Sequence, residues 1–348
     1  MIRFFYNFLG RHIAAKYAGD IRARLSEDEW AELVALARAA QRTDPLFRAF
    51  TQPGASLDGS PIDPSRLAAL LSRLKTVADF DAAMMPEAVL SNPVLNPYRR
   101  PAFRLLPEDL RATLSRTPIV ATPRFRFEGF ASKFRSSGRY FIQIPFGMTF
   151  VLRPLAEVSL GTYLSDSPES PDKLQVYLDA LRVVVSELDA PSPQVFVRVN
   201  DALKGLTPPR LGVVHFAHLI GVFLMLHELG HVGLKHWTPD HMGTLSTEEC
   251  IVLRNQEIAA DRFAAGCILR TSRDRPVHWD DVREMHILWI CQFLSAIELH
   301  LKGTRKEVPQ HYPTFEERRL ALLESFQAPH RLRSSVQLAN ELFARAVS

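Results

Sequence analysis

The stretch His227-Glu228-Leu229-Gly230-His231 lies inside a long apolar run that predicts a helix over residues 210–237. Residues four apart in a helix lie one turn apart on the same face, so His227 and His231 can bind one cation together. Glu228 lies about 100° further round the helix and can reach a water molecule beside that cation. The stretch therefore predicts a metal-binding pair of imidazoles with an adjacent carboxylate.

A second helix is predicted over residues 246–270. Ser246 and Glu249 form the pattern of a capping box at its start. Glu257 and Asp261 lie on this helix, again four apart and on one face. The second helix therefore offers two acidic side chains to the same ion.

A catalytic zinc ion takes three protein ligands and keeps a fourth position open for water. We expect His227, His231 and Glu257 to be the ligands of a Zn²⁺ ion. Asp261 is then expected to accept the second N–H of a ligand histidine and to hold its ring in place. Glu228 completes the pattern H-E-x-x-H, in which the glutamate is the general base of a zinc hydrolase.

Two alternatives apply to these residues. The two histidines of H-E-x-x-H can be core side chains that lie one turn apart by chance, although Glu228 and the second helix argue against this. Glu248 or Glu249 can replace Glu257 as the third ligand. Acidic residues at a helix start, however, serve as caps and offset the helix dipole. Glu257 is preferred because an unpaired carboxylate in its apolar mid-helix surroundings would be costly.

At this point the chain resembles gluzincin-type zinc metallopeptidases over roughly residues 215–322. It is similar to the CAAX-prenyl-protease and HtpX-like group and to the phage-exclusion Lit-type peptidases, through H-E-x-x-H and the Glu-x-x-Ala-Asp of residues 257–261. His311-Tyr312-Pro313, followed by Arg318, is similar to the His-Pro and downstream Arg of that group, with Tyr312 interrupting the pair. The resemblance implies a catalytic role for His311, which we expect to stabilise the oxyanion, and a structural one for Arg318. The alternative for His311 is a histidine of a surface loop.

Composition excludes several classes of protein. Of the 348 residues, 47% are apolar and 23% are charged, which is ordinary for a globular protein. The net charge of +4 comes without a long Lys/Arg block, so no nucleic-acid partner is expected. Three cysteines without a Cys-x-x-Cys pair predict buried free thiols and a reducing compartment. The longest apolar run, residues 211–226, is shorter than the roughly 20 residues of a membrane span, so we expect a cytoplasmic protein without one.

The predicted fold class is α+β. A predominantly helical, zincin-like catalytic domain is expected over residues 116–348, with a small antiparallel sheet within residues 118–163. A helical N-terminal region over residues 1–115 is expected to precede it.

Finer expectations come from local patterns. Residues 140–144 and 148–152 are predicted to be strands of the sheet, and residues 124–127 alternate as a strand does. An edge of the sheet can bind an extended substrate by strand addition, or the sheet can merely cover the core. Residues 91–107 contain four prolines and predict an extended connector. Helices are expected over residues 27–37, 63–77, 108–114, 172–188, 279–301, 314–326 and 337–347.

The sequence thus predicts a zinc-dependent metalloendopeptidase that acts on an intracellular protein or peptide. The resemblance to Lit-type peptidases implies a protease of stress or phage defence. One alternative is a regulatory metal-binding protein with a zincin fold and no proteolytic role, which would not need the base Glu228. Another is a peptidase-type regulator that acts with a DNA-binding module or partner, and a salt-dependent DNA shift would support it.

Overall fold

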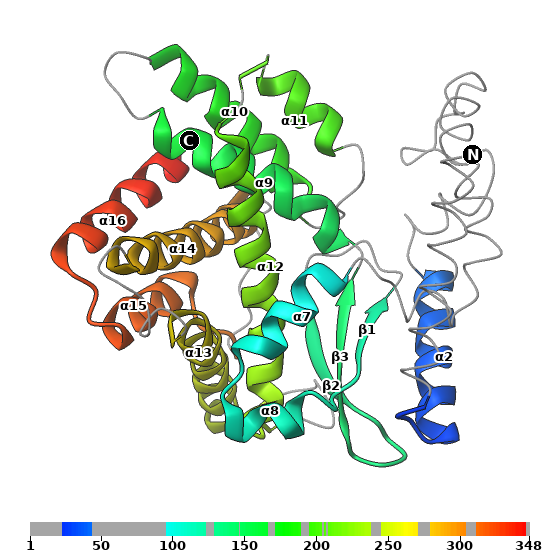
Figure 1. The fold of residues 1–348 in the computed structure, drawn as a ribbon. Helices are drawn as coiled ribbons and strands as arrows, with labels where there is room; N and C mark the ends of the chain where they lie inside the picture. The colour runs from blue at the N-terminus through cyan, green and yellow to red at the C-terminus, as the bar shows by residue number, and fades with distance from the viewer. Residues whose placement is uncertain are drawn as a thin grey trace, which may run out of the picture. The chain divides into compact units, whose positions relative to one another are not determined.

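A computed structural model of the protein describes the chain in segments. These are residues 23–43, 95–122, 129–145, 147–165, 171–188, 195–203, 205–206, 208–237, 245–270, 279–303 and 311–345. The predicted fold class is confirmed, since the chain is mostly helical with one small sheet (Figure 1). The predicted helix at 63–77 and the predicted strand at 124–127 lie outside the described residues.

The chain divides into two compact units. The first, which we call the sheet unit, comprises Met1–Asn96 and Arg116–Met148, and the second, the helical unit, comprises Pro97–Ser115 and Thr149–Ser348. The division at residue 115 that the sequence suggested stays a prediction, because most of the N-terminal region lies outside the described residues.

The sheet of the first unit has three strands, β1 (Ile119–Thr122), β2 (Phe130–Lys133) and β3 (Tyr140–Pro145), in the order β1-β3-β2. Strand β2 pairs antiparallel with β3, whereas β1 pairs parallel with it. The expectation of a purely antiparallel sheet is therefore wrong for β1. Sequence alternation predicts which face of a strand is buried, but it does not specify which strand will be its neighbour. Strand β1 pairs with β3 and not with β2, which follows it in the chain, and its neighbour therefore runs parallel to it.

Helix α2 (Glu27–Thr43) packs onto this sheet. Its predicted capping box forms, with the Ser26 N–H donating to Glu29 Oε2 at 3.0 Å and the Glu29 N–H donating to Ser26 Oγ at 3.1 Å. Leu33 and Phe134, both almost fully buried, belong to one core cluster with Trp30, Val120 and Phe141. The capping box at which the helix begins therefore also positions the apolar face of the helix.

Two predicted elements have the wrong type. Residues 148–152 lie in helix α9 (Gly147–Leu164), not in a strand. Met148, Leu152 and Leu155 are all buried, a spacing of three to four that a five-residue window cannot show. Residues 96–105, expected to be extended, form helix α7 (Asn96–Leu105). Proline is tolerated in the first turn of a helix, so Pro97 does not prevent it.

The helical unit contains α7, most of α9, and eight further helices among the described residues. Helices α12 and α13 pack against one another, and α14, α15 and α16 share a second apolar core (Figure 1). The eight further helices are α8 (Glu108–Leu114), α10 (Pro171–Ser186), α11 (Val195–Leu203), α12 (Arg210–Gly233), α13 (Thr247–Arg270), α14 (Trp279–Gly303), α15 (Phe315–Ser325) and α16 (His330–Arg345).

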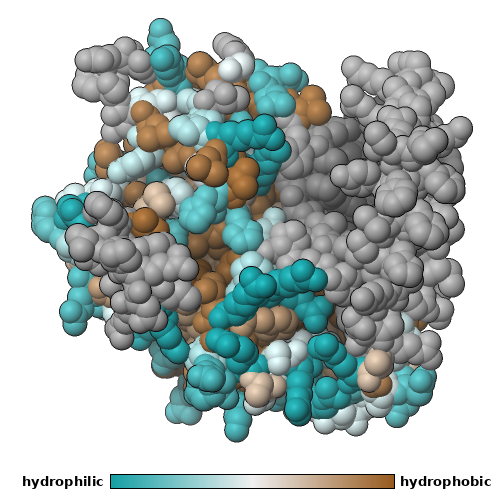
Figure 2. Space-filling model, in the orientation of Figure 1, coloured by the Kyte–Doolittle hydropathy of each residue, from teal (hydrophilic) through white to brown (hydrophobic). Residues whose placement is uncertain are grey.

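Helix α12 contains the H-E-x-x-H stretch. Among the described helices it is the one long and apolar enough to cross a membrane, but 67% of its most apolar window is buried inside the protein. Such burial is typical of a helix in the core of a folded domain. Figure 2 shows apolar and hydrophilic residues interspersed on the surface of the helical unit. The three cysteines are free thiols; Cys267 and Cys291 are buried as predicted, whereas Cys250 is only half-buried, so the prediction is wrong for it.

Candidate metal centre

Helices α12 and α13 approach closely at Gly230, which lies inside the H-E-x-x-H stretch. A Cβ atom at Gly230 would lie 3.3 Å from the Cα of Ala260 and 3.0 Å from Phe263 Cδ1. Contacts this short are tighter than most Cβ contacts in proteins, so a side chain at position 230 would require its neighbours to shift by a few tenths of an ångström. The small residues Gly230 and Ala260 therefore let the two helix backbones approach and bring the face with Glu257 towards the two histidines.

The three predicted ligands converge. His227 Nε2 lies 3.3 Å from Glu257 Oε2, and His231 Nε2 lies 3.4 Å from Glu257 Oε1. The two Nε2 atoms are 3.1 Å apart. Among the described residues, these three side chains form the one group of three or more His, Cys, Asp or Glu side chains whose ligand atoms all lie within 4.8 Å of one another.

These separations agree with the size of a zinc coordination shell. Two ligand atoms at roughly 2.0–2.1 Å from a tetrahedral zinc are about 3.3–3.4 Å apart. The two nitrogen–oxygen separations match that edge, and the shorter N···N separation corresponds to an angle of about 98° at the metal. Two imidazole nitrogens and one carboxylate oxygen are also the donor set of many catalytic zinc sites. The residues present therefore fit a zinc ion.

Asp261 is placed to orient His227. Its Oδ1 lies 2.9 Å from His227 Nδ1, and its carboxylate is 1% exposed. Because a carboxylate only accepts, the Nδ1–H donates and the Nε2 atom faces Glu257 and His231. This is the contact expected of Asp261 from the sequence.

Arg318 balances the charge of Asp261. Its Nε donates to Asp261 Oδ2 at 2.6 Å and its Nη2 donates to Oδ1 at 2.7 Å, in a fully buried pair. Arg318 also lies over the ring of Phe315, 5.4 Å from its centroid. The sequence predicted a structural role for Arg318 but did not identify its partner, because 57 residues separate the two in the chain.

His236 is a neighbour of the site that the sequence analysis missed. Its Nδ1 lies 2.9 Å from His231 Nδ1. The end of α12 brings it there: the Lys235 N–H donates to Val232 O and the His236 N–H donates to His231 O, which is a Schellman motif. The sequence does not show this motif, because its left-handed residue, with φ of 55°, is Lys235 and not the usual glycine.

The alternative ligands and the remaining candidates have other surroundings. Glu249 is engaged in the predicted capping box, with the Ser246 N–H donating to its Oε2 at 2.8 Å, and Glu248 is exposed. Glu228 is buried, one residue after His227. His311 is half-buried, and its ring centroid lies 5.4 Å from that of Tyr312. The catalytic roles of Glu228 and His311 stay predictions.

In the metal-free centre, the pKa values of His227 and His231 are shifted in opposite directions. Burial lowers the pKa of His227, but the hydrogen bonds and charges of Asp261 and Glu257 outweigh it and raise the pKa to about 10. Burial and the charge on His227 lower the pKa of His231 to about 3. Although burial raises the pKa of Glu257, the hydrogen bond with His227 and the charges on His227, His231 and Arg318 together outweigh burial and hold that pKa below its usual value. At neutral pH the His227 ring is therefore protonated in the metal-free centre, whereas the His231 ring is neutral.

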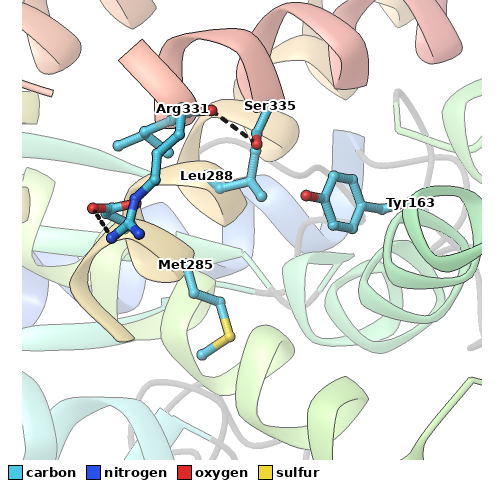
Figure 3. A pocket seen from close by; sticks show the side chains of 7 residues that line it. Tyr163, Met285, Leu288, Arg331 and Ser335 are labelled. Carbon is cyan, nitrogen blue, oxygen red and sulfur yellow. Dashed lines mark hydrogen bonds and ion pairs between the residues drawn. The ribbon is translucent and has the colours of Figure 1, made fainter. Parts of the chain in front are cut away.

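A separate cavity of 320 Å³ lies elsewhere in the helical unit (Figure 3). It is lined by residues of α9, α14 and α16, and Arg331 on its rim pairs with Glu284 at 2.7 Å. The lining residues are Tyr163, Glu284, Met285, Leu288, Arg331, Leu332 and Ser335. None of them is a predicted site residue, so the cavity is not part of the candidate metal centre.

Comparison with known proteins bears on the C-terminal part of the chain. Neither the curated proteins nor the solved structures contain a match to this chain. The family model Peptidase U49, of the Lit-type peptidases, matches residues 217–347. That segment includes the H-E-x-x-H stretch, Glu257, Asp261, His311 and Arg318. The region that contains the candidate metal centre is therefore similar to a peptidase family, which supports a peptidase function for this protein.

Proposed function

We propose that this protein is a zinc-dependent metallopeptidase that hydrolyses peptide bonds of an intracellular protein. His227, His231 and Glu257 would hold the zinc ion, and Glu228 would be the general base. The observation that carries the proposal is the convergence of the three ligand atoms, at separations that match the edges of a tetrahedral zinc site.

The chain's own residues would perform the proton transfers. A bound zinc ion would supply Lewis acidity, which polarises a peptide carbonyl and acidifies a water molecule. Glu228, adjacent to His227 and buried, would accept the proton of the attacking water and pass it to the leaving amine. His311 is our candidate for the group that stabilises the oxyanion, a contribution typically worth about 3–4 kcal/mol.

Two flanking contacts support the arrangement. The Asp261 carboxylate directs His227 Nε2 towards the centre, and the buried Arg318 keeps that carboxylate ionised. His236 contacts the Nδ1 atom of His231 and restricts its ring in the same way. Both imidazoles are therefore held in place before any ion binds.

The decisive experiment compares the proteomes of cells that express the wild type or Glu228→Gln, alongside the zinc content of both purified proteins. We expect about one zinc per chain in each, and cleaved substrate only with the wild type. Identical cleavage by the two proteins would exclude Glu228 as the base. Zinc in both, but no cleavage product from either, would favour the regulatory metal-binding protein instead.

The third ligand is tested separately. Glu257→Ala should lower the zinc content, whereas Glu249→Ala, which removes a capping residue, should leave it unchanged. Normal zinc occupancy in the Glu257 variant would remove that residue from the ligand set.

A further inference from the structure

A second pair of histidines joins two helices of the helical unit. His215 of α12 and His286 of α14 place their Nε2 atoms 3.0 Å apart. Neither residue is a predicted ligand of the zinc site, and the pair is accessible to solvent. His215 also lies outside the segment matched by the peptidase family model.

An aromatic cluster holds the two rings in place. Trp289, which is 5% exposed, stacks on Phe216 with centroids 4.8 Å apart and an angle of 4° between the rings. The His215 ring meets Trp289 edge-on at 5.5 Å, and the His286 ring lies 6.2 Å from it. Two imidazoles on different helices are thus positioned by one buried indole.

The spacing of the two nitrogens is that of neighbouring ligands on one metal ion. With metal–nitrogen bonds of roughly 2.0–2.1 Å, a separation of 3.0 Å gives an angle of about 94° at the metal. This angle is near the right angle of the tetragonal geometry that Cu²⁺ and Ni²⁺ adopt, and it is close to the angle of about 98° at the His227–His231 pair. Imidazole nitrogen is a suitable donor for these ions, and Cu²⁺ is the tightest binder in the first-row series.

We propose that His215 and His286 form a second metal site, which takes a late first-row divalent ion of tetragonal preference, Cu²⁺ above all. The ion bridges α12 and α14 through two imidazole nitrogens, and water completes its coordination. Burial lowers the pKa of both side chains, so each ring is neutral at pH 7 and presents a lone pair without first losing a proton. Without an ion, the pair is an N–H···N hydrogen bond.

Copper titration of the metal-free protein tests this site. The wild type should bind one equivalent of Cu²⁺ more than His215→Gln or His286→Gln, because glutamine lacks the imidazole ligand. This difference of one equivalent is independent of whether the His227 centre binds copper, so failure of the proposed peptidase site and failure of this one are distinguishable. His330→Gln, which removes an exposed histidine of α16, is the control and should keep the wild-type stoichiometry.

Two spectroscopic signals accompany the extra equivalent. Cu²⁺ beside Trp289 should quench its fluorescence, and this quenching should be absent from His215→Gln and His286→Gln. The electron paramagnetic resonance spectrum of the additional Cu²⁺ should show coupling to two imidazole nitrogens. Unchanged copper stoichiometry in both His215→Gln and His286→Gln, with circular dichroism showing folded proteins, would overturn the proposal.

Discussion

Arg318 forms a bidentate ion pair with Asp261 in the interior of the helical unit, with Nε 2.6 Å from Oδ2 and Nη2 2.7 Å from Oδ1. Asp261 in turn accepts the hydrogen bond of His227. The arginine is therefore linked to a predicted zinc ligand through a single carboxylate.

Removing this arginine should affect both stability and metal binding. Arg318→Ala leaves the Asp261 carboxylate buried without its partner, so the free energy of unfolding should fall by about 3–5 kcal/mol in urea denaturation. Zinc affinity, measured by competition with a chelator, should fall about 10–100-fold because His227 is less well oriented. Arg254→Ala breaks an exposed pair with Glu317 and serves as the control, with an expected loss within about 1 kcal/mol. Wild-type zinc affinity in Arg318→Ala would show that the pair does not act on His227.

The close approach of α12 and α13 at Gly230 predicts that two glycine substitutions change stability in opposite directions. In Gly230→Ala the new Cβ would lie 3.3 Å from Ala260 Cα, so Ala260 and its helix have to shift by a few tenths of an ångström, and zinc affinity and thermal stability should both fall. Gly266→Ala lies on α13 with open space around it and should raise stability by about 0.5–1 kcal/mol through helix propensity. Equal effects of the two substitutions in thermal unfolding would contradict the close packing at Gly230.

Zinc binding should release a proton at neutral pH. The pKa of His227 in the metal-free protein is raised to about 10, so its ring carries a proton that the metal must displace, whereas His231, with its pKa lowered to about 3, is already neutral. Below the pKa of His227 the apparent affinity therefore rises with pH, by about tenfold per unit between pH 6 and 8. Calorimetry in buffers of different ionisation enthalpy measures the released proton directly. An affinity that does not change over this range would mean that His227 is neutral before zinc binds.

The end of α12 offers a stabilising substitution. Lys235 adopts a left-handed conformation, with φ of 55°, at the position of the Schellman motif that favours glycine. Lys235→Gly should therefore raise the free energy of unfolding by about 1 kcal/mol and leave zinc affinity unchanged, since the motif that places His236 is kept. Gln327, with φ of 48° after α15, provides an independent comparison, and Gln327→Gly should have a similar effect. Chemical denaturation of both variants checks this prediction. A loss of stability in each would show that the left-handed backbone does not strain Lys235 and Gln327.

Several local features of this protein were readable from its sequence, although helices α7 and α9 were not. The helix with His227 and His231, the capping boxes at Ser26 and Ser246, and the face shared by Glu257 and Asp261 all depend on residues three or four positions apart. The period of a helix is fixed by its own backbone hydrogen bonds, so these relationships do not depend on the remainder of the fold.

Tertiary packing decided the rest. The pairing of Arg318 with Asp261, the 3.0 Å contact between His215 and His286, and the parallel direction of β1 join segments that are distant in the chain. Such contacts depend on which faces of different elements meet, and no periodicity within one element specifies that. The contact of His236 with His231 is short in sequence, but it required a lysine in a conformation that its residue type disfavours, which the surrounding hydrogen bonds of the helix end impose.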